Sequence, residues 1–272
     1  MLSYRHQFHA GNVADVFKHT MLTRLLLALA KKDKPFAMLD THAGIGRYDL
    51  DAEEARRTGE WQHGIGRLMD ITDGPLADYV GLVRADGGYP GSPALAAALL
   101  RPGDGLALVE LHEQDHATLR ALFHRDPRVA VHKRDAFEAV RALTPFPERR
   151  GLVLMDSPFE QPSEYERLAA AITEVSRRAR GLVQAAWYPI KGRAPVRAFQ
   201  TALRESGVRD ILAAELHLRE PTDAARLNGC GLIVVNAPHG FEDAARAMLE
   251  SLRARLSLEA GAGWSLIRIA DE

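Results

Sequence analysis

The chain has 272 residues, of which 46% are hydrophobic and 26% charged, so it can bury a full core as one large domain or as a domain with an insertion. Its net charge of -1 excludes a globally basic nucleic-acid binder, and its single cysteine, Cys230, excludes an internal disulfide. No apolar stretch is long enough to cross a membrane, and the apolar run at residues 25–30 is too short and too far in for a secretory signal. We therefore expect a cytoplasmic monomer without a membrane partner.

The N-terminal segment predicts a structured arm followed by a helix. Residues 1–11 are dense in aromatic, histidine and basic side chains and have no clear period. Asn12 is a suitable N-cap for a helix that runs to about residue 32. The apolar stripe of this helix consists of Val13, Val16, Phe17, Thr20, Met21 and Leu25. Asp15 and His19 lie off the stripe and four residues apart, so they form either an Asp–His pair or an ordinary exposed contact.

A short apolar strand is expected at residues 36–39, and the sequence DTHAGIGR follows it directly. This order resembles the glycine-rich first loop of a Rossmann-like nucleotide site. Gly44 and Gly46 permit tight turning and close approach of the backbone to a ligand. His42 adds a polar group at the same edge, although a histidine in a turn is more often structural.

Residues 48–89 depart from the alternation of strands and helices and predict a helical insertion. Two mostly polar helical stretches are expected, at residues 53–69 and 75–84, with no strong strand between them. The sequence YPGSP then returns the chain to the core, where Ser92 is a helix N-cap and Pro93 a first-turn proline. A contact from Ser92 to a ligand would be additional.

Acidic residues follow the next two expected strands. The strand at residues 106–109 ends at Glu110, which is placed to accept hydrogen bonds from ribose hydroxyls in a Rossmann-like unit. A third strand at residues 129–131 is followed by Asp135, where a carboxylate and the adjacent backbone can hold an adenine ring. Acids at strand ends also simply cap the helices that follow them.

One pattern indicates a different chemistry. The sequence HEQDH, from His112 to His116, matches the zinc-binding arrangement in which two histidines lie on one helical face and Glu113 acts as the base. Here the pattern begins only two residues after a strand end, and no third ligand stands out among the other histidines. We therefore expect no metal, and a zinc hydrolase remains an alternative.

The central stretch is a continuous apolar strand at residues 151–155 that ends in Asp156, Ser157, Pro158 and Phe159. In open α/β sheets, ligands bind outside the carboxyl ends of the strands, so this quartet should line a crevice. It resembles the Asp-Pro-Pro-Tyr/Phe signature of methyltransferases that act on amino or amide nitrogens, with Ser157 in place of the first proline. The Asp156 carboxylate and the Ser157 carbonyl can accept two N–H bonds of an adenine amino group while Phe159 stacks on the base. A common strand-to-turn connection would show the same residues.

The C-terminal half returns to strands and helices, and adds basic side chains. Helices are expected at residues 165–178, 195–206 and 241–256, and strands at residues 181–187, 211–218, 231–236 and 264–269. Residues 187–189 are expected to open a loop that carries Lys191 and Arg193 toward a substrate. Local basic patches that could contact nucleic acid are Arg5 with Lys18, and Lys191 with Arg193 and Arg197.

Several motifs in this order resemble the ribosomal large-subunit methyltransferase J family: MLSYRHQFHAGNVADVFKH at the start, LDTHAGIGRY, YPGSP, the VEL strand end and MDSPFE. The resemblance spans nearly the whole chain. It implies an α/β, Rossmann-like class I methyltransferase whose core with its N-terminal arm occupies residues 1–47 and 90–272, and a helical insertion at residues 48–89. It also implies an enzyme that methylates N6 of an adenine in 23S ribosomal RNA with S-adenosylmethionine.

The resemblance implies a role for individual residues as well. The cofactor-binding positions are His19, His42, Gly44, Ser92, Glu110, Asp135, Ala136 and Asp156. Asp156 matches the catalytic acid, and Tyr4 and Lys18 are expected to act toward the RNA. The chain departs from the sequence pattern of the family at two positions: Ser157 replaces a proline, and Ala136 replaces a common glycine. The alternatives are the same chemistry on DNA adenine or a protein glutamine, a zinc hydrolase, and an inactive fold that only binds RNA.

Overall fold

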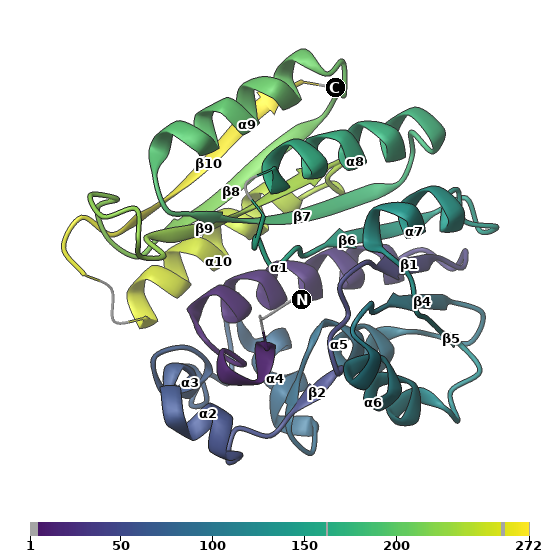
Figure 1. Ribbon diagram of the computed structural model, residues 1–272, viewed down its shortest axis with the longest axis horizontal. Helices are drawn as coiled ribbons and strands as arrows, with labels where there is room; N and C mark the ends of the chain where they lie inside the picture. Colours follow the sequence, from purple (N-terminus) through teal and green to yellow (C-terminus); the bar gives the residue numbers. More distant parts are fainter. Residues whose placement is uncertain (1–4, 162, 257–258, 272) are drawn as a thin grey trace.

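The computed structural model describes residues 5–161, 163–256 and 259–271, and a mixed sheet lies at its centre (Figure 1). Within these residues the sheet has eight strands: β1 (Ala37–Asp40), β4 (Gly105–Val109), β5 (Val129–His132), β6 (Gly151–Met155), β7 (Val183–Ile190), β8 (Ile211–His217), β9 (Gly229–Val235) and β10 (Gly263–Ala270). Their order across the sheet is β10-β8-β9-β7-β6-β1-β4-β5.

The half of the sheet from β7 to β5 is parallel, and the other half contains the antiparallel pairs. Strand β1 pairs in parallel with β4 and β6, and β6 pairs in parallel with β7. Strand β9 lies between β7 and β8 and is antiparallel to both, while β10 is antiparallel to β8. This arrangement confirms the expected class I methyltransferase fold, and it brings the carboxyl ends of β1, β4, β5 and β6 to one edge of the sheet.

Helices cover both faces of the sheet. One layer contains α1 (Val13–Ala30), α5 (Ser92–Leu99), α6 (Glu113–Phe123) and α10 (Phe241–Arg255); the other contains α7 (Ala136–Leu143), α8 (Glu164–Arg178) and α9 (Arg193–Glu205). Side chains alternate between the layers along each strand. Leu152 and Leu154 of β6 belong to the hydrophobic core under the first layer, and Val153 and Met155 to the core under the second. Because both faces are covered, β6 is an uninterrupted apolar run.

Helix α1 is buried on nearly every side. It begins as expected, since the Asn12 side chain accepts a hydrogen bond from the peptide N–H of Asp15 at 3.0 Å. The expectation of one apolar stripe was wrong, because Asp15, Lys18 and His19 are buried along with the apolar residues. The helix lies between α5 and α10 and also contacts α4 (Ala77–Ala85), which covers part of what would otherwise be an exposed face. Among the described residues, no helix is both long enough and apolar enough to cross a membrane.

The segment between the first strand and α5 packs against α1, as Figure 1 shows. A two-stranded antiparallel ladder, β2 (Arg47–Tyr48) with β3 (Tyr89–Pro90), closes its base. Between them lie α2 (Glu53–Thr58), α3 (Glu60–His63), the 3-10 turn η2 (Ile65–Arg67) and α4. The first expected helix is therefore broken, because Gly59 adopts a left-handed conformation with φ 63° that ends α2. Side chains such as Ile65 and Tyr79 join the same hydrophobic core as α1, and the division of the chain into a core and an insertion stays a prediction.

Candidate active site

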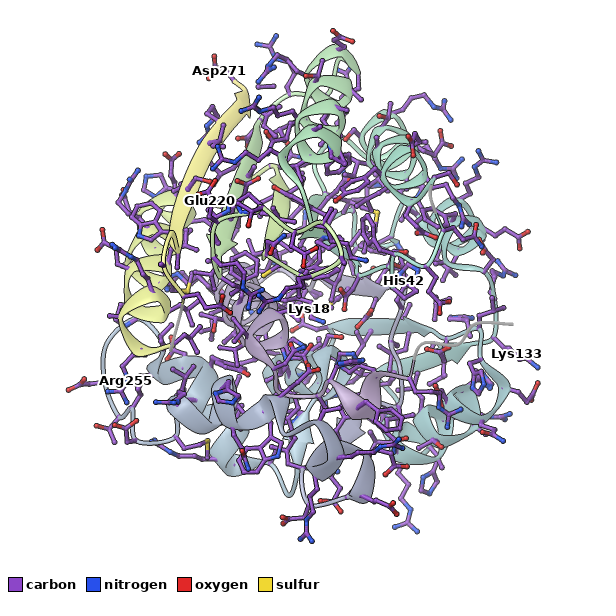
Figure 2. The ribbon with its side chains drawn as sticks, turned by 60° about the vertical axis from the view of Figure 1, so that its left-hand side comes forward. Lys18, His42, Lys133, Glu220, Arg255 and Asp271 are labelled. Carbon is purple, nitrogen blue, oxygen red and sulfur yellow. The ribbon has the colours of Figure 1, made fainter. Side chains whose placement is uncertain are left out.

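A cavity of about 840 Å³ lies at the carboxyl edge of the parallel strands. Lys18 and His42, two of its lining residues, lie near the middle of the molecule in Figure 2. The cavity brings together twelve residues that were expected at the site: Lys18, His19, His42, Gly44, Ser92, Glu110, Asp135, Ala136, Asp156, Ser157, Pro158 and Phe159. Tyr4 lies outside the described residues. Residues far apart in the sequence thus meet in one pocket, and each wall is formed by a different strand end.

The glycine loop and the end of β4 form one wall of the cavity. The peptide N–H of Gly44 donates to Glu110 Oε2 at 2.9 Å, and that of His112 donates to Oε1 at 2.7 Å. Burial raises the pKa of the Glu110 carboxyl, while these two donors oppose the rise. Gly44 has φ 59°, and a Cβ atom there would lie 2.4 Å from the Tyr48 hydroxyl oxygen, so both the backbone and the space favour glycine. Each Glu110 oxygen keeps a lone pair, which is what hydrogen bonds from ribose hydroxyls need.

Asp40, at the end of β1, is buried behind the second wall of the cavity, which His42 and Ser92 line. Its Oδ2 accepts a hydrogen bond from the Ser92 hydroxyl at 2.6 Å, and its Oδ1 accepts one from the peptide N–H of His42 at 3.2 Å. Burial raises the pKa of Asp40 to about 6, and burial lowers the pKa of His42 to about 4. The expected capping role of Ser92 was wrong. Gly91 precedes α5, and the Ser92 side chain binds Asp40.

His19 reaches the cavity from α1 as a buried, neutral side chain. Its Nδ1 is hydrogen-bonded to the Tyr89 hydroxyl at 3.0 Å, and that hydroxyl is also 3.0 Å from the hydroxyl of Tyr79. Burial lowers the pKa of His19 to about 3, although the charge of Asp15 opposes this. Neither expected alternative for Asp15 and His19 holds, because both residues are buried and each binds other partners.

Lys18 lies between two carboxylates. Its ammonium donates to Asp15 Oδ1 at 3.0 Å and, in a short contact, to Asp156 Oδ2. Burial alone would lower the pKa of Lys18, but the charges of Asp156 and Asp15 outweigh it and hold that pKa well above its ordinary value. Asp15 is buried too, and His6 and Lys18 hold its pKa well below the ordinary value despite that burial. The expected surface patch of Arg5 with Lys18 was therefore wrong, because Lys18 is buried and ion-paired.

The quartet after β6 is held by buried polar and aromatic contacts. Asp156 Oδ2 binds Lys18, and no hydrogen bond to its Oδ1 is present among the described residues. The Ser157 hydroxyl donates to Glu164 Oε2, and both residues are almost fully buried. Phe159 adopts φ 52°, which is uncommon for a residue other than glycine. Its ring makes edge contacts with Tyr165 and Trp187, at centroid distances of 4.8 and 6.0 Å.

The loop after β5 forms the far end of the cavity. Asp135 caps α7, since its Oδ1 accepts hydrogen bonds from the peptide N–H groups of Phe137 at 2.9 Å and Glu138 at 3.1 Å. Its Oδ2 is 3.6 Å from a guanidinium nitrogen of Arg167, whose central carbon lies 4.1 Å from the Phe137 ring centroid. As the first residue of α7, Ala136 has a peptide N–H without an acceptor inside the helix. This end of the cavity thus offers a ligand a hydrogen-bond acceptor in Asp135, a donor in the Ala136 peptide N–H and the aromatic ring of Phe137.

The HEQDH sequence does not form the zinc-binding arrangement of the alternative hypothesis. His112 precedes α6 in an extended conformation, so the two histidines do not both lie on the face of one helix. Glu113 forms an ion pair with Lys133. In residues 5–161, 163–256 and 259–271, no group of three histidine, cysteine or acidic side chains could hold a metal ion.

Two further expectations about the substrate side need correction. Residues 187–189 do not open a loop, because β7 continues to Ile190. Lys191, just beyond it, lines the cavity. Arg193 and Arg197 line a separate hollow of about 260 Å³, where Arg193 pairs with Glu220 at 2.5 Å.

The lining of the cavity also includes residues that were not singled out from the sequence as site residues, among them His6, Glu164, Arg167 and Trp187. Glu164 and Arg167 are three residues apart in the first turn of α8, but the helix was expected to begin only at residue 165, so this pairing was not indicated. Nothing local indicated that this pair would face the cavity. Trp187 was identified only as the end of a strand, and its side chain faces Phe159 because β7 lies beside β6.

Comparisons with known proteins cover nearly the whole chain. A family model described as ribosomal RNA large subunit methyltransferase D, RlmJ, matches residues 33–268. Over 275 residues the chain is 40% identical to ribosomal RNA large subunit methyltransferase J of Escherichia coli strain K12, with 98% of each chain covered. Over 281 residues it is 41% identical to the protein of the same name from Haemophilus influenzae strain ATCC 51907, with 100% of each covered. A crystal structure of a protein from Legionella pneumophila strain Philadelphia 1 is 32% identical with a TM-score of 0.86, covering 96% of this chain and 98% of that one.

Proposed function

Because the chain belongs to the ribosomal RNA large subunit methyltransferase J family, and is therefore a methyltransferase that acts on ribosomal RNA, we propose that it methylates N6 of an adenine in 23S ribosomal RNA with S-adenosylmethionine. The single observation that carries the proposal is Asp156 at the end of β6. One of its oxygens is held by Lys18, while the other has no hydrogen-bond partner among the described residues, and the residue lines the cavity beside Phe159.

The adenine amino group needs this arrangement because its lone pair is delocalised into the ring. Asp156 Oδ1 accepts one amino N–H and the Ser157 carbonyl accepts the other, which directs the nitrogen lone pair into the cavity. Phe159 and Trp187 provide the aromatic surface against which the base stacks. As positive charge grows on the nitrogen, the Asp156 carboxylate stabilises it, and Lys18 keeps that carboxylate in place.

The remaining walls of the cavity fit S-adenosylmethionine. Glu110 would accept the ribose hydroxyls, and the Gly44 loop allows close approach of the ligand to the backbone. Asp135 Oδ2 and the Ala136 N–H offer an acceptor and a donor to the adenine ring beside Phe137. A volume of about 840 Å³ lies within the range of small-molecule sites. When bound, the cofactor supplies an electrophilic methyl group on a sulfonium.

The RNA must present its adenine outside a base stack, because the amino group cannot reach the cavity from inside a helix. Tyr4, in the arm, and Lys18 belong to the RNA side of the proposal, with Lys18 acting through Asp156. Arg134 and Lys191 are exposed cationic residues that line the cavity near β5 and β7, where phosphates of the flanking nucleotides could bind. We extend the proposal to a cytoplasmic monomer, since the substrate is ribosomal RNA and one chain supplies each of these residues.

The test is single-turnover methyl transfer to protein-free 23S ribosomal RNA with saturating cofactor. Asp156→Ala should lower the rate by about 10²–10³, because it removes a preorganised acceptor. Glu205→Ala is the matched control, since Glu205 is an exposed carboxylate at the end of α9 that does not line the cavity. An Asp156→Ala enzyme with nearly the wild-type rate would overturn the proposed role of this residue.

A further inference from the structure

A chain of contacts, buried at Ser157 and Glu164, connects the quartet after β6 to helix α8. The Ser157 hydroxyl donates to Glu164 Oε2, and Arg167, one helical turn further on, donates to Glu164 Oε1 at 3.4 Å. The side chain of Glu164 is only 6% exposed. A carboxylate removed from water to this degree depends on its partners, so Ser157 and Arg167 are held together through Glu164.

The other contacts of Arg167 lie at the opposite end of the cavity. Its guanidinium lies over the Phe137 ring at 4.1 Å and is 3.6 Å from Asp135 Oδ2. These two residues form the wall that, under the proposed function, holds the adenine ring of the cofactor. A planar guanidinium can stack on a ring while its edge faces two carboxylates, whereas a lysine ammonium has no planar face to stack on the ring. Arg167 therefore contacts both the cofactor wall and the acid that holds the quartet.

The quartet needs such support because of its backbone. Phe159 has φ 52°, a conformation that a non-glycine residue keeps only when its surroundings hold it there. The loop must also place Asp156 and Phe159 at the same time, one against the amino group and the other against the base. A change in the contact of Ser157 with Glu164 thus alters the position of both.

We propose that Arg167 is a positioning residue that couples the cofactor wall to the loop of residues 156–159, so that cofactor and RNA each raise the affinity of the enzyme for the other. This inference rests on the proposed function. A ligand that contacts Asp135 and Phe137 fixes Arg167, then Glu164, then Ser157, and so favours the loop conformation that receives the base. Coupling between two sites is reciprocal, so the same factor must appear whichever ligand binds first.

The experiment measures dissociation constants at one fixed salt concentration, because RNA affinity depends strongly on salt. S-adenosylhomocysteine replaces the cofactor so that no methyl group is transferred, and protein-free 23S ribosomal RNA is the second ligand. The affinity for RNA is measured with and without S-adenosylhomocysteine, in the wild type, Arg167→Ala and Arg167→Lys. Arg177→Ala is the matched control, because Arg177 pairs with Glu174 three residues away on the same helix, at 3.0 Å, and does not line the cavity.

In the wild type and in Arg177→Ala, S-adenosylhomocysteine should tighten RNA binding by about fivefold or more. In both Arg167 variants this factor should fall below about twofold, even where each ligand still binds, a change that mere loss of stability would not produce. Arg167→Lys keeps the positive charge, so this factor can still be measured in it if Arg167→Ala does not fold. Coupling that persists in Arg167→Lys, or is absent from the wild type although both ligands bind, overturns the inference. A wild type that binds neither ligand refutes the proposed function itself, and this inference with it.

Discussion

Replacing Lys18 with methionine should destabilise the protein strongly. The Lys18 side chain is 6% exposed and holds two carboxylates, Asp15, which is 2% exposed, and Asp156, which is 18% exposed. Methionine keeps the volume of the side chain but leaves both carboxylates without their shared cation. Removing one partner of a buried ion pair costs about 3–5 kcal/mol. The total stability of a domain is about 5–15 kcal/mol, so Lys18→Met should lose roughly a fifth of it or more.

Urea unfolding monitored by circular dichroism measures this loss as a shift in midpoint. The matched control is Lys31→Met, because Lys31 is an exposed lysine at the end of the same helix. The double variant Lys18→Met/Asp156→Asn removes one of the two carboxylate charges that Lys18 had neutralised. Its loss should therefore be smaller than the sum of the single losses, by about 0.5–3 kcal/mol. A loss below about 1 kcal/mol for Lys18→Met, or additive losses in the double variant, would refute the reasoning.

Three further predictions address the cofactor wall, the quartet and the pH dependence. Glu110→Ala should weaken cofactor binding about tenfold or more by calorimetry, because hydrogen bonds to a charged acceptor contribute about 1.5–3 kcal/mol. Ser157→Pro and Ser157→Ala should each cost about 1–3 kcal/mol in urea unfolding, because both leave buried Glu164 without its hydroxyl donor. Burial raises the pKa of Asp40 to about 6 in the folded state, so the wild type loses stability as pH rises from 4 to 7. Asp40→Asn lacks this titrating group, and its stability relative to the wild type should therefore rise by up to about 3 kcal/mol over that interval.

Each of these predictions has an outcome that contradicts it. Cofactor affinity that is the same in Glu110→Ala as in the Glu205→Ala control would remove Glu110 from the ribose site. Wild-type stability of Ser157→Pro would show that the Ser157 hydroxyl does not stabilise buried Glu164. For Asp40, a stability difference between Asp40→Asn and wild type that stays constant from pH 4 to pH 7 would show that the folded protein does not bind this proton more tightly than the unfolded chain.

The central strands and the residues at their ends could be predicted from the sequence because their signals are local. Strand β6 is a short, unbroken apolar run, and Asp156 follows it directly. The same reasoning located Glu110 after β4 and Asp135 after β5. Since the carboxyl ends of parallel strands share one edge, the strand ends alone were enough to bring these residues together.

The surroundings of the buried polar residues could not be predicted in the same way. Lys18 and Asp156 are 138 positions apart, and nothing near either residue shows that one is the partner of the other. Helix α1 was expected to have an exposed face because the packing of α4 and α10 against it depends on distant segments. The contact of the Ser157 hydroxyl with Glu164 could not be predicted, because the sequence does not show that Glu164 is buried beside it.

The most direct test of the proposed chemistry is the identity of the methylated nucleoside. The purified enzyme is incubated with S-adenosylmethionine that carries an isotopic methyl group, and with protein-free 23S ribosomal RNA, duplex DNA or a glutamine-containing peptide in parallel. The RNA is then digested to nucleosides, which are identified by mass spectrometry. The account predicts the label in N6-methyladenosine from the RNA alone, and its loss with Asp156→Ala. Label in any other nucleoside, or transfer to the DNA or the peptide in place of the RNA, would contradict it.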